Sequence, residues 1–313
     1  MMASTELIMP DELDLAIIDE LGDDGRKPTK SIAEALGVAE ATVSNRIRAL
    51  HSNRIIRVMA QRNMWALGYE AQCFIDVYCD GSSIDAVAEA AARIPSVTGV
   101  NVVLGTPQVI IYAFTKRYAD MLELQRQVSG LPGVRRTELH VGLATHKYRA
   151  DIGSLDTPLP TVSPDHPSLD ELIIRELQID ARRSNREISR VIGAPASTVT
   201  ERINRLRSNR EIRIGVVRDI TRTGFPVVAH MTMQVDAHQM DQALGAIAAI
   251  EQVTMLTVAA GVFNLALLLV VQSFEQLRDV VEQKLGRVPG VLQLQPRIVS
   301  RSTLHRFDLI CET

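Results

Sequence analysis

Two short stretches of the 313-residue sequence place hydroxyl, amide and charged side chains at helical spacing around an apolar stripe. In the first stretch Val43, Ile47 and Leu50 form the stripe, so the polar side chains between them point outward. Short hydroxyls, amides, Arg and Glu are the groups that hydrogen-bond base edges in the major groove of DNA. The candidate base-reading residues are Thr42, Ser44, Asn45 and Arg48 in the first stretch, and Ser197, Thr198, Thr200, Glu201 and Asn204 in the second.

Basic side chains flank both stretches. Residues 26–62 hold eight Lys/Arg and two Glu, and residues 182–222 hold eleven Arg and four acids, although the net charge of the chain is −3. Positive charge gathered in this way indicates a binding surface for phosphates. Arg46 and Arg202 lie beside the apolar stripe, so they either pair within the protein or reach the DNA backbone. The candidate phosphate contacts are Arg54, Arg57, Arg210 and Arg213, together with Arg26, Lys27, Arg182 and Arg183.

Both stretches belong to a long internal repeat with an offset of 156 residues. Residues 13–58 align with 169–214 without a gap, and 20 of the 46 pairs are identical. In each copy the pattern predicts a helix, a short helix closed by a glycine, and a third amphipathic helix, which is typical of a helix-turn-helix (HTH) unit. Asp11 and Thr29 are expected N-caps. The expected helices are 12–21, 29–36 and 40–52 in the first copy, and 169–177, 185–192 and 196–208 in the second.

The remainder of each copy alternates strand, helix, strand, strand, helix, strand. This order predicts a ferredoxin-like βαββαβ sheet with two helices on one face, so the expected fold class is α+β. Residues 265–271 show no polar alternation, which indicates that both faces of the sheet are covered, as sheet-to-sheet packing would do. The expected strands are 71–79, 99–104, 109–114 and 134–143, then 227–235, 253–260, 265–271 and 291–299. The expected helices are 83–94, 117–129, 237–250 and 273–285.

These patterns predict four domains and a linker. The HTH domains are expected at 1–63 and 169–219, and the ferredoxin-like domains at 64–150 and 220–313. The segment 151–168 contains four prolines and is expected to be an extended linker. At ~3.1 Å per residue it would span up to about 50 Å. Residues after Arg301 are expected to extend past the last strand, and the sequence does not predict where Phe307, Leu309 and Ile310 dock.

The chain resembles the Lrp/AsnC family of bacterial and archaeal transcriptional regulators. The resemblance implies an HTH reading head joined to a "regulation of amino-acid metabolism" (RAM) domain, which dimerises through its sheet and in many members binds an amino acid or a related metabolite. The matching motifs are Leu13-Asp14-x-x-Ile17-Ile18, Thr42-Val43-x-x-Arg46-Ile47-x-x-Leu50 and their second copies, with the turns Pro132-Gly133-Val134 and Pro289-Gly290-Val291.

The resemblance also places an effector loop between the second and third strands of each RAM domain. Family loops read Gly-x-Tyr/Phe-Asp, and the two loops here lack the carboxylate that would pair with an α-ammonium group. Two interpretations therefore stay open, a metabolite site or a plain β-turn. The family's usual Ser before the third helix is Ala39 in one copy and Pro195 in the other, which weakens the helix cap by ~1 kcal/mol. The candidate effector-binding residues are Gly105, Thr106, Gln108, Gly261, Phe263 and Asn264.

Together the patterns predict a sequence-specific DNA-binding regulator in which one chain acts as a pseudo-dimer. Because the outward residues differ between the copies, the two half-sites of the operator should differ. The expected partners are double-stranded DNA, a small metabolite such as an amino acid, and further copies of the chain through the RAM sheets. The expected location is the cytoplasm, on the nucleoid, since residues 1–14 show no signal-peptide pattern and the longest apolar run, 265–271, is too short to span a bilayer.

No cofactor, metal centre or catalytic residue is expected. The seven histidines are dispersed without metal-ligand spacing, and the three cysteines make no framework. Two alternatives stay open. One is a metabolite sensor or scaffold that has lost DNA binding. The other is an enzyme similar to the siroheme decarboxylases, which share this architecture and need His and Arg near the second RAM strand; residues 100–104 and 255–259 contain neither.

Overall fold

The computed structural model describes residues 9–153, 155, 167–220 and 222–311. The chain divides into two compact units, and each unit takes one part from each copy of the repeat. The described residues within 9–67, 150–224 and 307–310 form the HTH unit, and those within 68–149, 225–306 and 311 form the RAM unit. Most of the predicted linker, 156–166, lies outside the described residues. In the described part of the chain no helix is long and apolar enough to cross a membrane.

The helices of the HTH unit begin and end within two residues of their predicted positions. Asp11 caps the first helix in a capping box with Asp14, as predicted. Thr29 does not cap the second helix, because the helix already begins at Thr29 and follows Pro28, which has no side-chain donor or acceptor. The helices are α1 (Glu12–Asp23), α2 (Thr29–Leu36) and α3 (Glu40–Ser52), then α6 (Leu169–Ile179), α7 (Asn185–Ile192) and α8 (Ala196–Ser208).

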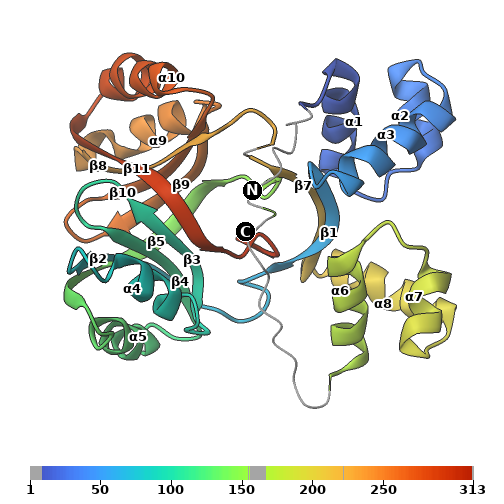
Figure 1. Ribbon diagram of the computed structural model, residues 1–313, viewed down its shortest axis with the longest axis horizontal. Coiled ribbons are helices and arrows are strands. Elements are labelled where there is room, and N and C mark those ends of the chain that lie inside the picture. The colour runs from blue at the N-terminus through green and yellow to red at the C-terminus, as the bar shows by residue number, and fades with distance from the viewer. Residues whose placement is uncertain (1–8, 154, 156–166, 221, 312–313) are drawn as a thin grey trace. The chain divides into compact units, whose positions relative to one another are not determined.

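A four-stranded sheet joins the two HTH domains. Strands β1 (Ile56–Asn63) and β7 (Ile212–Asp219) pair antiparallel, with β12 (Leu309–Ile310) beside β1 and β6 (Ile152–Gly153) beside β7. Figure 1 shows β1 and β7 running between the two groups of helices. Apolar side chains from both copies form one hydrophobic core around this sheet. The two HTH domains therefore fold as one unit, whose stability depends on both copies.

Two expectations about the chain ends of this unit are wrong. The predicted linker does not begin at Asp151, because Ile152 and Gly153 hydrogen-bond to β7 as β6. The tail does not start at Arg301 either, since the last strand of the RAM unit continues to His305. Phe307 is 1% exposed and packs with Met59, Leu155 and Val217 in a small core of the HTH unit.

The RAM unit contains two βαββαβ motifs in the predicted order. The first comprises β2 (Ala71–Cys79), α4 (Ile84–Ala91), β3 (Val97–Val103), β4 (Val109–Thr115), α5 (Asp120–Ser129) and β5 (Val134–Tyr148). The second comprises β8 (Val227–Val235), the short 3-10 helix Ala237–Gln239, α9 (Met240–Ala248), β9 (Val253–Ala260), β10 (Leu265–Val271), α10 (Phe274–Asp279) and β11 (Val291–His305). The predicted helix 273–285 is not continuous, because it changes to a π-helix over Val280–Lys284 and a 3-10 turn over Leu285–Arg287.

The two sheets of the RAM unit join at their edges and close into an eight-stranded barrel. The strand order is β10-β8-β11-β3-β4-β2-β5-β9. The pairs β11–β3 and β5–β9, which close the barrel, each join one strand of the first copy to one strand of the second. Helices α4 and α5 cover one side of the barrel and α9 and α10 another (Figure 1), with a separate apolar core beneath each pair. Both sheet faces are thus covered, as predicted, but by barrel closure, which also leaves no free sheet edge.

Candidate nucleic-acid interface

The two HTH domains contact each other through reciprocal backbone hydrogen bonds. The Gly25 amide donates to the Ile214 carbonyl at 3.1 Å, and the Ala181 amide donates to the Val58 carbonyl at 2.9 Å. The two donors are 156 residues apart, and so are the two acceptors. This is the contact pattern of an isologous dimer, formed here within one chain.

Two arginines strengthen this pairing in the same reciprocal way. Arg26 donates to the Ala181 carbonyl at 2.6 Å, the Arg183 carbonyl at 2.8 Å and the Asn185 side chain at 2.7 Å. Arg182 donates to the related positions of the first copy, the carbonyls of residues 25 and 27 at 3.0 and 3.3 Å and the Thr29 hydroxyl at 3.2 Å. We call Arg26 and Arg182 the arginine clasp. Its partial burial lowers the pKa of both guanidinium groups.

The arginine clasp corrects part of the sequence interpretation. Arg26 and Arg182 were expected to contact phosphate, but their donors bind carbonyls and side chains of the opposite HTH domain. Lys27 pairs with Glu20, and Arg183 pairs with Glu176 at 2.6 Å. These four basic side chains are engaged within the HTH unit.

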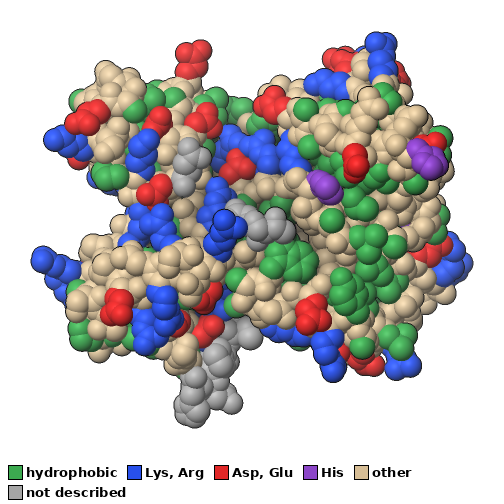
Figure 2. All heavy atoms as spheres, turned by 180° about the vertical axis from the view of Figure 1, so that it is seen from behind, with side chains coloured by type: hydrophobic (Ala, Val, Ile, Leu, Met, Phe, Trp, Pro, Cys, Tyr) green, Lys and Arg blue, Asp and Glu red, His purple; other side chains and the backbone are tan. Residues whose placement is uncertain are grey.

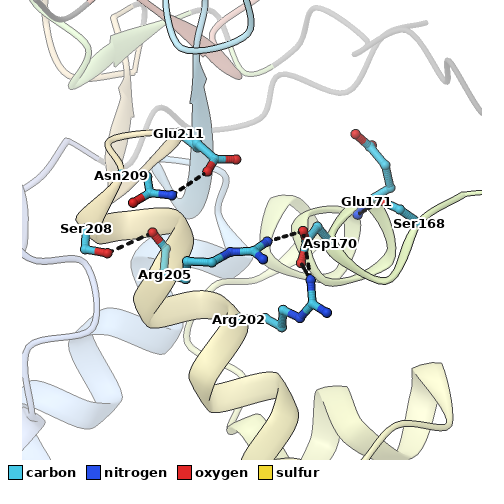
Figure 3. Close-up of polar contacts among 8 residues, drawn as sticks. All are labelled: Ser168, Asp170, Glu171, Arg202, Arg205, Ser208, Asn209 and Glu211. Carbon is cyan, nitrogen blue, oxygen red and sulfur yellow. Dashed lines mark hydrogen bonds and ion pairs between the residues drawn. The ribbon is translucent and has the colours of Figure 1, made fainter.

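Arg46 and Arg202 tie the third helix of each HTH domain to its first helix. Arg46 lies 2.5 Å from Asp11 and 3.2 Å from Asp14, and the hydrogen bond that Arg46 donates to Asp11 raises the pKa of Arg46. Arg202 lies 3.4 Å from Asp170, which Arg205 also contacts (Figure 3). Of the two roles left open by the sequence, the structure places these side chains in internal pairs.

The faces of α3 and α8 opposite the core carry the candidate base-reading side chains. Asn45 and Arg48 are exposed on α3, and the Arg48 guanidinium donates to the Asn45 side-chain oxygen at 3.0 Å. Thr200 is exposed too, but its hydroxyl donates to the Ala196 carbonyl at 2.9 Å and accepts from Asn185 at 2.8 Å. Of the other candidates, Ser197, Glu201 and Asn204 are exposed, and Thr42, Ser44 and Thr198 are half-buried.

The remaining candidate phosphate contacts fall into two pairs. Arg57 and Arg213 lie on the paired strands and are half-buried, with Arg57 5.6 Å from the Phe307 ring centre and Arg213 donating to the Gly22 carbonyl at 2.8 Å. Arg54 and Arg210 are exposed and follow the ends of α3 and α8, with φ of 55° and 54°. Lys and Arg side chains are prominent on the surface of the HTH unit in Figure 2.

The two effector loops of the RAM unit use their amide side chains to hold the backbone. The Gln108 side-chain oxygen accepts from the Cys79 amide at 2.9 Å. Asn264 accepts from the Val235 amide at 2.9 Å and donates to the Val235 carbonyl at 2.6 Å. Gly105, Thr106 and Gly261 are exposed, whereas Phe263 is 6% exposed. Since both amides are engaged at strand ends, an effector would have to compete with these hydrogen bonds.

Sequence reasoning missed a buried polar cluster inside the barrel. Asp76 and His140 are each 1% exposed and His230 is fully buried. Arg297, from the second copy, lies 3.4 Å from Asp76. Burial lowers the pKa of His230 to about 4. The available signal was an aspartate in the middle of the largely apolar strand 71–79, because a charge at such a position needs a partner.

The two HTH domains and the RAM barrel, taken with the family profiles, define a class of protein, the DNA-binding transcriptional regulators. Two family profiles match the chain, each of them twice. The AsnC-type helix-turn-helix domain matches residues 11–51 and 168–207, and the Lrp/AsnC ligand binding domain matches residues 72–152 and 228–309. The chain belongs to the Lrp/AsnC family, as a tandem duplication.

Relatives of known name match one copy at a time. The HTH-type transcriptional regulator FL11 of Pyrococcus horikoshii is 30% identical over 143 residues, which is 45% of this chain and 95% of that protein. An uncharacterized HTH-type transcriptional regulator of Pyrococcus furiosus is 33% identical over 134 residues, 42% of this chain and 90% of that protein. The siroheme decarboxylase NirDL has a similar fold, with a TM-score of 0.65 at 15% identity over 94% of this chain and 92% of that one.

Proposed function

We propose that a single chain carries a complete pair of non-equivalent reading heads and binds an operator with two different half-sites. The observation that carries the proposal is the reciprocal HTH pairing, in which Gly25 and Ala181 each hydrogen-bond to the opposite copy. In the family a second chain supplies the second head, whereas here the second copy of the repeat supplies it. The two heads are therefore joined covalently and cannot exchange partners.

The two heads differ in charge. Residues 11–51 contain five Lys/Arg and nine acids, whereas residues 168–207 contain eight Arg and six acids. Attraction to the phosphate backbone dominates affinity for DNA. The second head therefore supplies most of the electrostatic attraction, and the first head depends more on contacts to bases.

The exposed side chains also differ in what they can read. Arg48 suits the two acceptors of guanine and Asn45 suits adenine, whereas Glu201 in the second head suits the amino group of cytosine. A single chain then distinguishes the two ends of its operator, which a symmetric dimer does not. The operator is expected to be non-palindromic for this reason.

Footprinting and gel shifts with the full chain test this proposal. Two symmetrised operators, each made from one half-site, should bind more weakly than the natural site and to different extents. Arg48→Ala should cost about 1–3 kcal/mol on the site built from one half and much less on the other. Arg117→Ala, an exposed substitution in the RAM unit, is the matched control. Equal affinity for both symmetrised sites, or equal loss on both with Arg48→Ala, would contradict two distinct half-sites.

We further infer a regulator without catalytic activity that acts on the nucleoid in the cytoplasm, assembles with other copies through the RAM unit and responds to a small metabolite. The strands β3 and β9 contain neither His nor Arg, the residues that siroheme decarboxylase chemistry needs there. Incubation of the purified chain with siroheme should leave the absorption spectrum of the pigment unchanged. A stable coloured complex would favour the enzyme instead.

A further inference from the structure

Three potential metal ligands meet inside the RAM barrel. Asp76 lies on β2, and Glu138 and His140 lie on the neighbouring β5, where Asp76 pairs with Glu138 and Phe74 with His140 in the strand register. One ligand atom from each of the three side chains lies within 4.8 Å of the others. The imidazole Nε2 of His140 is 3.8 Å from a carboxylate oxygen of Asp76. Two oxygens and one nitrogen thus converge from two adjacent strands.

The hydrogen-bonding groups of this trio are left unsatisfied. Both ring nitrogens of His140 and one oxygen of Asp76 have no hydrogen-bond partner among the described residues, and both side chains are 1% exposed. Buried polar groups in folded proteins nearly always have partners, so each such group needs an explanation. A bound ion explains two of these atoms, because it accepts a lone pair from the Asp76 carboxylate and one from a single ring nitrogen of His140.

The surroundings hold the ligands in place without blocking them. Glu138 accepts hydrogen bonds from Tyr78 at 3.0 Å and from Arg136 at 2.5 Å, and a carboxylate has four lone-pair positions, so it can still bind a metal. Arg297 lies 3.4 Å from one oxygen of Asp76 and offsets part of the negative charge. Arg136 and Arg297 balance the two carboxylates, so affinity for an ion would come from the converging ligand atoms and not from an excess of negative charge.

The other side of the His140 ring lies against the second effector loop. The Phe263 ring centre is 4.2 Å from the imidazole centre, and a Cβ on Gly261 would collide with Nδ1. Nδ1 therefore faces the loop, while Nε2 faces Asp76. Coordination through Nε2 would fix the imidazole ring against which Phe263 packs. Ion binding would therefore affect the loop through His140.

We propose that Asp76, Glu138 and His140 bind one divalent transition-metal ion of the Zn²⁺ type inside the barrel. The imidazole nitrogen favours Zn²⁺, Fe²⁺ or Co²⁺ over Mg²⁺ and Ca²⁺, which prefer oxygen ligands only. Three protein ligands leave a coordination position open for water or a small molecule. Sequence spacing did not reveal this site because its ligands come from two strands separated by about sixty residues.

The duplication determines how many metal ions one chain is expected to bind. The positions of the second copy that correspond to Asp76, Glu138 and His140 are Thr232, Gln295 and Arg297, which cannot form the same site. One ion per chain is therefore expected, not two. Binding of surplus metal at surface histidines would give a different number.

The test is a metal titration of the full chain after removal of bound metal with a chelator. Co²⁺ should bind one equivalent per chain with the visible absorption of a nitrogen–oxygen site, and Zn²⁺ should displace it. His140→Gln and Asp76→Asn should each lower the affinity at least ~10-fold, because loss of a direct ligand exceeds the usual effect of outer contacts. His146→Gln, an exposed histidine on the same strand, is the matched control.

Circular dichroism of each variant shows whether it has folded. Glu138 is only partly buried, so Glu138→Gln provides a third variant if Asp76→Asn does not fold. Absence of Co²⁺ and Zn²⁺ binding by the full chain would overturn the proposal. Unchanged affinity and stoichiometry in folded His140→Gln and Glu138→Gln would overturn it as well.

Discussion

The HTH unit and the RAM unit contain the same duplication, but they differ in whether equivalent positions of the two copies play the same part. In the HTH unit, equivalent positions make equivalent contacts, as Arg26 and Arg182 do in the arginine clasp. Inside the RAM barrel, equivalent positions carry different chemistry, since His140 corresponds to Arg297 and Phe74 to His230. Pairing of the heads thus kept its symmetry, while the barrel interior lost it.

The difference shows what a fused chain permits. In a homodimer every substitution appears in both subunits, whereas here Asp76 corresponds to Thr232 and Arg297 corresponds to His140. In this chain Asp76 from one copy faces Arg297 from the other, at 3.4 Å. A buried charge is tolerated when it is paired, and the duplication makes such heterologous pairing available.

Removal of both arginines of the clasp should have the largest effect, about 4 kcal/mol if the two contributions add. Arg26→Ala and Arg182→Ala should each lower the free energy of unfolding by roughly 2 kcal/mol, because partly buried carbonyls lose charged donors. The double variant should lose more than either single one, as measured by urea denaturation. The two single variants should lose the same free energy of unfolding, within about 0.5 kcal/mol, if the two contacts are energetically equivalent. Clearly unequal losses of free energy would show that the two contacts of the arginine clasp are not equivalent.

In the RAM barrel, where the two copies differ, His230 should make the free energy of unfolding depend on pH. Burial lowers its pKa from 6.5 in the unfolded chain to about 4, against a smaller opposing effect of Asp76, while Arg297 and His140 lower it further. The unfolded chain therefore binds the proton first, and stability falls as the pH drops from about 6.5 to 4. The loss attributable to this residue is roughly 3 kcal/mol.

Urea denaturation at a series of pH values measures this contribution. His230→Phe introduces the residue of the first copy and should flatten the profile in that window. The ring would still have the edge-to-face neighbour Tyr112, which contacts both Phe74 and His230. An unchanged profile in the folded variant would assign the pH dependence to other groups.

A smaller asymmetry within the HTH pairing can be tested at Gly25. A Cβ on Gly25 would lie 2.7 Å from a Val58 methyl group and 3.2 Å from the Gly215 backbone, whereas the equivalent residue, Ala181, already carries a Cβ. Gly25→Ala should therefore cost about 1–3 kcal/mol through overpacking. Ala181→Gly, the reverse exchange, should cost only about 0.5–1 kcal/mol. Thermal unfolding compares the two, and equal effects would show that the pairing absorbs the added methyl group.

The smallest effect is expected at the cap of α3. Ala39 has extended backbone angles but no capping side chain, while Ser168 caps α6 by accepting from the Glu171 amide at 3.2 Å. Ala39→Ser should add up to about 1 kcal/mol of stability, and Ser168→Ala should remove a similar amount. Both changes are measured by thermal unfolding. A loss of stability in Ala39→Ser would show that the cap position is strained by its neighbours.

Much of the fold could be predicted because local patterns determine it. The helices 29–36, 40–52, 185–192 and 196–208 were predicted with the observed bounds, since apolar spacing and Gly37 and Gly193 mark their faces and ends. The two-residue strands β6 and β12 could not be predicted. Their pairing depends on distant backbone and leaves no periodic signal.

The candidate site was harder to predict than the fold. Arg26 and Arg48 look alike in the sequence, yet the first holds the two HTH domains together and the second is exposed on α3. Only the position of the opposite copy distinguishes them. Asp76 and His140 likewise become neighbours only through the register of β2 and β5.

The short strand β12 affects how the protein is made. The amide of Arg62 donates to the Asp308 carbonyl at 2.8 Å, and the amide of Met64 donates to the Ile310 carbonyl at 2.9 Å. The DNA-binding half of the molecule therefore remains incomplete on the ribosome until residues 307–310 have been synthesised. A product truncated shortly before that point has both recognition helices but lacks an edge strand and the buried Phe307, so this half can mature only after residues 307–310 have been translated.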